Sequence, residues 1–172
     1  MRLIPRGFRL GSPPGLSHSA AVPLVALALA AFVVTPAALS AQDPAARFGV
    51  WRMQSDAPPP SSNVMTYGPH GDGGMSVTVE SINARGQSSK WGYVTLFDGV
   101  FRAVDGQDGS DTAVEFVNNR TTRITNRRDG RVTQVIINTL SEDGNVIENE
   151  YVRMDAEGKI VGVSHAVYVR VR

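Results

Sequence analysis

The chain has 172 residues, of which 42% are hydrophobic, with 17 Lys and Arg against 16 Asp and Glu and no cysteine. The absence of cysteine excludes disulfide bonds, thiol catalysis and cysteine-ligated metal sites. A formal net charge of +1 gives no global support for nucleic-acid binding.

Residues 1–41 have the order of features that is typical of a secretory signal peptide. Three arginines stand within the first nine residues, an uncharged apolar run covers residues 20–34, and small residues precede a cleavage site after Ala41. The rival interpretation is an uncleaved membrane anchor, because residues 20–39 have nearly the length that spans a bilayer. We expect cleavage and export, to the periplasm or the extracellular space. The leader holds three basic and no acidic residues, so the mature chain keeps 14 basic against 16 acidic residues, a net charge of −2.

Residues 42–47 are expected to form a short linker, and residues 48–172 a single β domain. Its turns are marked by Gly, Asn and Asp, which permit the positive φ angles that tight hairpins need. Eight such signals occur, at residues 69–74, 83–87, 97–100, 105–111, 118–121, 127–131, 141–145 and 155–159. They predict about eight to ten strands joined in sequence order.

Between the turns, apolar and polar residues alternate as in half-buried antiparallel strands. Met75, Val77 and Val79 share one face of a predicted strand, while residues 131–140 are apolar on both faces. No segment after the leader has a convincing helical period. Regular hairpins favour a β-sandwich or a closed up-and-down barrel, and closure has the advantage of removing exposed strand edges.

The first predicted strand begins with the triplet Gly49-Val50-Trp51, and Arg170 lies on the last strand. This combination resembles the calycin barrels, the group that contains lipocalins and fatty-acid-binding proteins. The resemblance implies that the tryptophan plugs the closed end of the barrel. It also implies that the arginine packs across the indole ring, a cation–π contact that ties the first strand to the last.

Longer stretches of the chain are similar to a family of exported bacterial lipocalin-like proteins. They cover residues 49–56, 66–80, 91–106, 125–132 and 155–168. The shared positions are mostly turn and core residues. The resemblance therefore implies a calycin-like, up-and-down antiparallel barrel and leaves its contents open.

An aromatic stripe marks a candidate ligand-lining surface. Trp91, Tyr93 and Phe97 share one parity, with Thr95 between them as a polar contact. Such a stripe either lines a ligand cavity or fills the core of a small barrel, and both interpretations stay open.

Two histidines follow the leader. His70 stands in a Gly-rich turn, where exposure is expected. His165 shares parity with the valines of the last strand, so it either faces the interior as a further lining residue or packs at the rim. The sequence has no nucleophile turn of the Gly-x-Ser-x-Gly kind and too few grouped metal ligands, so we expect no catalytic residue, no metal site and no cofactor.

Arginines are concentrated between residues 120 and 131. Arg123, Arg127 and Arg128 form a candidate patch for anions, including the phosphates of an envelope lipid. The alternative is an ordinary charged outer face of the barrel.

Two functions remain open for a barrel of this kind, with an enzyme the least favoured class. The first is a monomeric exported carrier that binds a small apolar or amphipathic ligand inside, with an affinity that changes little with salt. The second is a barrel filled by its own side chains that acts as a structural or interaction module. The volume of the interior distinguishes them.

Overall fold

The computed structural model describes residues 43–171, so the predicted signal peptide and its cleavage site lie outside the described residues. The described part contains a short 3-10 helix, η1 (Pro44–Arg47), followed by strands. The strands are β1 (Gly49–Met53), β2 (Ser62–His70), β3 (Gly74–Ile82), β4 (Ser88–Thr95), β5 (Arg102–Ala103), β6 (Ser110–Phe116), β7 (Thr121–Arg128), β8 (Arg131–Leu140), β9 (Val146–Met154) and β10 (Ile160–Arg170).

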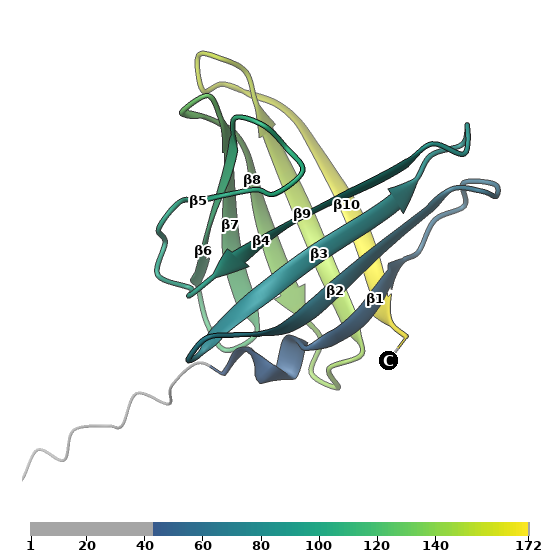
Figure 1. The fold of residues 1–172 in the computed structure, drawn as a ribbon, viewed down its shortest axis with the longest axis horizontal. Helices are drawn as coiled ribbons and strands as arrows, with labels where there is room; N and C mark the ends of the chain where they lie inside the picture. Colours follow the sequence, from purple (N-terminus) through teal and green to yellow (C-terminus); the bar gives the residue numbers. More distant parts are fainter. Residues whose placement is uncertain (1–42, 172) are drawn as a thin grey trace, which may run out of the picture. The chain divides into compact units, whose positions relative to one another are not determined.

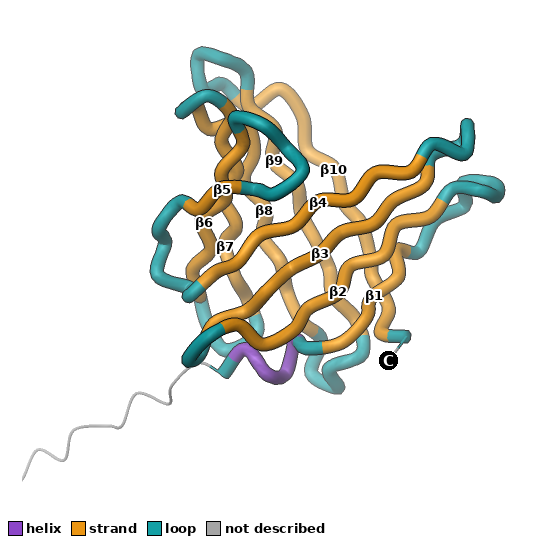
Figure 2. The backbone as a smooth tube through the Cα atoms, viewed as in Figure 1, coloured by secondary structure: helices purple, strands orange, loops and turns teal. Residues whose placement is uncertain are grey.

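These ten strands form one antiparallel sheet in the order β4-β3-β2-β1-β10-β9-β8-β7-β6-β5. Strands that are neighbours in sequence pair with each other, except β4 and β5, which are the two edges of the sheet. In addition, β1 pairs with β10, with Trp51 opposite Arg170. The sheet curls into a nearly closed barrel, with β1–β4 crossing in front of β7–β10 (Figures 1 and 2). The predicted all-β, up-and-down antiparallel barrel is confirmed, and its strand number lies at the upper end of the expected range.

The remaining seam, between β4 and β5, is bridged at one point. The N–H of Gly92 donates to the carbonyl of Asp105 at 3.0 Å, and the N–H of Asp105 donates back to Gly92 at 2.8 Å. Gly106 has a φ of +79°, and a Cβ there would lie 2.6 Å from the carbonyl oxygen of Lys90. Glycine at this position is what lets the β5 segment approach β4 closely.

The apolar core is concentrated toward the end of the barrel that η1 covers. A cluster around Trp51 includes Met75 and Ile147, and a smaller cluster joins Val114 to Ile124 and Ile136. Because apolar residues fill this end, space inside the barrel is left toward the opposite end of the strands.

Residues 43–47, the described part of the segment predicted as a linker, have a defined structure. The side chain of Asp43 accepts a hydrogen bond from the N–H of Ala45 at 2.8 Å, and Pro44 begins η1, as is common in the first turn of a helix. Arg47 at the end of η1 is buried, so this segment packs against the barrel instead of only leading into it. Among residues 43–171, no helix is long and apolar enough to cross a membrane.

Candidate functional site

The closed end of the barrel is built around Trp51, which is 0% exposed. The guanidinium of Arg170 lies 4.2 Å from the centroid of the indole ring, within cation–π reach. Arg170 also donates to the carbonyl oxygens of Gly144 at 2.8 Å and Ala46 at 2.7 Å. Gly49 begins β1 with a φ of 144°, which favours glycine. The three residues expected at barrel closure are thus together, and they join β1, β10 and η1.

Arg47 is a buried cation at the same end, and no local sequence pattern marks it. It is 2% exposed and donates to the Oδ1 of Asn138 and, at 2.5 Å, to the carbonyl oxygen of Arg120. Its own carbonyl oxygen accepts the indole N–H of Trp51 at 2.9 Å. Burial lowers the pKa of Arg47, while the nearby hydroxyl of Tyr67 acts in the opposite direction. Because both of its terminal guanidinium nitrogens donate within the protein, Arg47 is a structural part of the closed end.

A chain of polar side chains leads from Arg47 into the barrel. Asn138 donates to the Oδ1 of Asn149 at 2.7 Å, and Asn149 donates to the hydroxyl of Tyr151 at 3.1 Å. The hydroxyls of Tyr151 and Tyr168 are 3.5 Å apart, and Tyr168 donates to the Oδ1 of Asn63 at 3.3 Å. These contacts fix side chains of β2, β8, β9 and β10 relative to one another, which gives the interior a defined polar surface.

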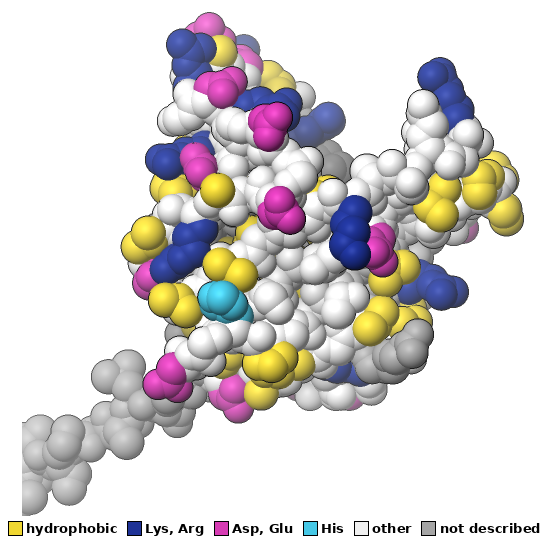
Figure 3. Space-filling view, in the orientation of Figure 1, with side chains coloured by type: hydrophobic (Ala, Val, Ile, Leu, Met, Phe, Trp, Pro, Cys, Tyr) yellow, Lys and Arg dark blue, Asp and Glu magenta, His cyan; other side chains and the backbone are white. Residues whose placement is uncertain are grey.

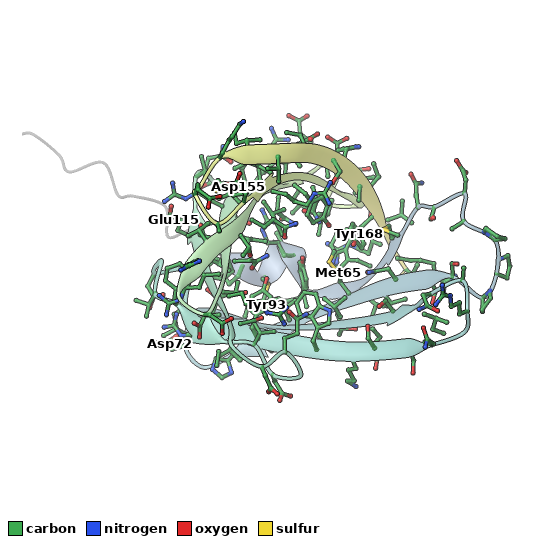
Figure 4. The ribbon with its side chains drawn as sticks, turned by 90° about the horizontal axis from the view of Figure 1, so that it is seen from above. Met65, Asp72, Tyr93, Glu115, Asp155 and Tyr168 are labelled. Carbon is green, nitrogen blue, oxygen red and sulfur yellow. The ribbon has the colours of Figure 1, made fainter. Side chains whose placement is uncertain are left out.

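A cavity of about 620 Å³ lies in the barrel between β2–β4 and β6–β9. This volume is in the range of pockets for small ligands, roughly 300–1,000 Å³. Figure 4 looks into the barrel from above and shows Met65, Tyr93 and Tyr168 inside it, with Asp72, Glu115 and Asp155 at its periphery. The interior is therefore not filled by the chain's own side chains.

The two sides of the cavity differ in chemistry. The side formed by β2, β3 and β4, here called the apolar wall, presents Met65, Tyr67, Val77, Val79, Trp91 and Tyr93, with Asn63 near the start of β2. The side formed by β6 to β9, here called the polar wall, presents Thr112, Asn126, Gln134, Asn149 and Tyr151, with Ile124 and Ile136 among them.

Burial favours the neutral form of three tyrosines of the cavity, Tyr67, Tyr93 and Tyr168. Burial raises the pKa of Tyr67 to about 12, although the charge of Arg47 partly opposes the shift. Burial also raises the pKa of Tyr93 and of Tyr168. At neutral pH these residues are therefore hydroxyl donors and acceptors and carry no charge.

Of the predicted lining residues, Trp91 and Tyr93 line the cavity, with their ring planes 16° from parallel. Thr95 and Phe97 do not line it. The hydroxyl of Thr95 is buried and accepts the backbone N–H of Phe97 at 2.9 Å. Strand β4 ends at Thr95, and Phe97, with a φ of +58°, stacks instead on Phe116 at a centroid distance of 4.2 Å.

His165 lies on the outer face of the barrel, so of the two positions that the sequence left open for it, the interior one is wrong. Its side chain is 45% exposed, and its Nε2 is 3.7 Å from the Oε1 of Glu150 on β9. Tyr168 and Ala166, on the opposite parity, are the residues of β10 that pack inward. His70, at the end of β2, is exposed as expected.

The candidate anionic patch is divided between two environments. Arg123 forms an ion pair with Glu115. Arg127 is 2.9 Å from Asp111 and lies 4.0 Å over the ring of Phe101, and with Arg128 it lines the rim of the cavity. Figure 3 shows Lys and Arg interspersed with Asp and Glu on the face that it presents. The three arginines therefore do not form one free basic surface.

Among residues 43–171, no three His, Asp or Glu side chains are grouped so that they could hold a metal ion. The described residues of the cavity offer hydrogen bonding, aromatic surface and a basic rim. This arrangement suits binding of an organic molecule.

Comparison with known proteins identifies the fold. No family model matches the chain, and no curated protein matches its sequence. Among solved structures, the barrel is similar to wild-type fluorescent protein UnaG, with a TM-score of 0.53, 12% identity, and coverage of 74% of this chain and 99% of that one. It is also similar to the fatty-acid-binding protein of Schistosoma mansoni, solved in complex with arachidonic acid, with a TM-score of 0.52, 11% identity, and coverage of 74% and 97%. The chain thus has a calycin-like barrel fold.

Proposed function

We propose that the mature protein is an exported lipocalin-like carrier that binds a small amphipathic ligand inside its barrel and catalyses no reaction. The observation that carries this proposal is the cavity of about 620 Å³, lined by aromatic, aliphatic and hydrogen-bonding side chains. Calycin-like neighbours include a protein crystallised with a fatty acid, which supports binding in a barrel of this kind.

The alternative, a side-chain-filled barrel that acts as an interaction module, requires an interior without such space. The cavity favours the carrier. The proposal includes export to the periplasm or extracellular space, which is supported by the leader pattern of residues 1–41. Intact-mass measurement of exported protein should give an N-terminus at Gln42. A mass that retains residues 20–34 would indicate a membrane anchor instead.

Binding is tested by titrating delipidated protein with fatty acids and lipophilic dyes. We expect saturable binding that is lost, by more than about tenfold, when Val79→Trp fills the cavity from the apolar wall. The matched control is Glu80→Trp, because Glu80 is the next residue on β3 and is exposed on the outer face. Binding that survives Val79→Trp, or no saturable binding to any compound, would refute the carrier proposal.

A further inference from the structure

The cavity has an asymmetry that constrains its ligand. The apolar wall presents mostly aliphatic and aromatic side chains, including Val77 and Val79, and its amide is that of Asn63 near the start of β2. On the polar wall, facing them, Thr112 donates to the Oδ1 of Asn126 at 2.8 Å, and Asn126 donates to the Oε1 of Gln134 at 3.0 Å. Three neighbouring strands, β6, β7 and β8, thus carry a continuous row of hydrogen-bonded side chains along one side of the cavity.

This row ends in unused hydrogen-bonding capacity. The amide N–H groups of Gln134 donate to no side chain or backbone group among residues 43–171. Every fully buried side-chain polar atom of the described residues has a partner, so the free N–H groups of Gln134 are accessible from the cavity that the residue lines. Polar groups in such a position are normally satisfied by water or by a ligand.

A flexible alkyl chain suits only one of the two walls. Methylene groups placed against Gln134 would displace water and leave its amide N–H groups without partners, at a free-energy cost. A rigid ligand with chemically different faces meets both demands, because its apolar face covers the valines and aromatic rings while its other face bonds to the amides.

We propose that the cavity binds a rigid, facially amphipathic molecule, with its apolar face on β2–β4 and its hydroxyl-bearing face on β6–β8. A polycyclic compound hydroxylated along one side belongs to this class. The inference rests on the proposed function and specifies its ligand. The row of fixed side chains favours a rigid ligand further, because neither partner loses much conformational freedom on binding.

Steroid acids provide matched probes for this proposal. Cholanic, lithocholic and cholic acid share a ring system and a carboxylate, but differ in the hydroxylation of one face. Calorimetric titration of each, and of palmitic acid as the linear probe, is carried out at one salt concentration. Any attraction between the carboxylate and Arg127 or Arg128 is then the same for the three steroids, so differences in affinity report the hydroxyl groups.

We expect affinity to rise with hydroxylation, by about threefold to tenfold for each hydroxyl that finds a partner, with palmitic acid weaker than cholic acid. In Gln134→Met, an apolar replacement of similar length, the preference for cholic over cholanic acid should shrink by at least threefold. The control Gln54→Met, on an exposed residue after β1, should leave the preference unchanged. If Gln134→Met fails to fold, the wild-type series decides.

Several results would overturn the proposal. These are an affinity that falls with hydroxylation, a preference that Gln134→Met leaves intact, or palmitic acid as the tightest ligand. Palmitic acid that binds tightest and is excluded by Val79→Trp would reject the facial ligand and leave the carrier function standing. No binding of any probe or lipophilic dye would reject both.

Discussion

Replacement of Trp51 tests the physical account of the closed end. Trp51→Ala removes a fully buried indole, which typically costs about 3–5 kcal/mol. The indole N–H also donates to the carbonyl of Arg47 at 2.9 Å, and the ring lies under the guanidinium of Arg170 at 4.2 Å. Because both contacts are lost together with the apolar burial, we expect the free energy of unfolding to fall by the upper part of that range.

The loss is large against the stability of a typical domain, about 5–15 kcal/mol. It is measured by urea unfolding of the chain from Gln42, followed by far-ultraviolet circular dichroism. Trp91→Ala is the matched control, because Trp91 is half-buried on the cavity wall and its removal should cost only about 1–2 kcal/mol. A double-mutant cycle with Arg170→Gln should show a coupling of about 0.5–2 kcal/mol. Equal losses for the two tryptophans would refute the assignment of Trp51 as the plug.

Three further predictions concern pH, the seam and the rim. Burial raises the pKa of Tyr67 to about 12 from 10.0, so its contribution to stability is fully present below pH 10 and is lost as pH rises through about 12. Tyr67→Phe should therefore flatten the decline of the urea midpoint with pH, and an unchanged decline would contradict this. Gly106→Ala should destabilise the barrel more than Gly130→Ala, because both have positive φ but only Gly106 has backbone within 3 Å of the added Cβ. Thermal unfolding compares them, and equal losses would show that the seam is not tightly packed. Arg128 and Arg153 line the cavity rim, so the affinity for an anionic ligand should fall as salt rises. The double variant Arg128→Gln, Arg153→Gln should lower that affinity about threefold and reduce its salt dependence. A neutral ligand that showed the same dependence would exclude this role.

Local patterns predicted the strands and turns well, because alternation and turn chemistry act over short distances. Gly130, with a φ of +78°, lies in the hairpin between β7 and β8, where Asp-Gly had predicted a turn. The contact that joins β1 to β10 was expected from the Gly-x-Trp triplet and Arg170. That expectation came from the resemblance to calycin barrels, because the alternation of residues along a strand does not tell which distant strand it pairs with.

The interior was less predictable because parity fails at irregular positions. Phe97 leaves the aromatic stripe because β4 ends before it and its φ is positive. On β10, apolar residues occur on both faces, so the sequence does not show which face is inside. Val163 shares the face of His165 and is 62% exposed, so an apolar neighbour did not mark an inward position. Arg47 has partners 73 and 91 residues away, and no local pattern carries that information.

The sequence of β8 contains a pattern that points to the polar wall. Gln134 and Asn138 share parity with Ile136 and Leu140 on β8, so two amides stand on the face of the strand that the aliphatic residues bury. Amides at inward positions require hydrogen-bonding partners inside the barrel, which Asn138 finds in Arg47 and Asn149.

The pairing of β1 with β10 has a consequence for how the chain acquires its structure. Besides β2, strand β1 pairs with a strand about 120 residues later in the chain, and Arg47 bonds to Asn138 on β8. Such non-local closure slows folding, because the entropy of a long loop is lost before the contacts that compensate it are made. Closure of the sheet therefore depends on β10, which pairs with β1 on one side and with β9 on the other.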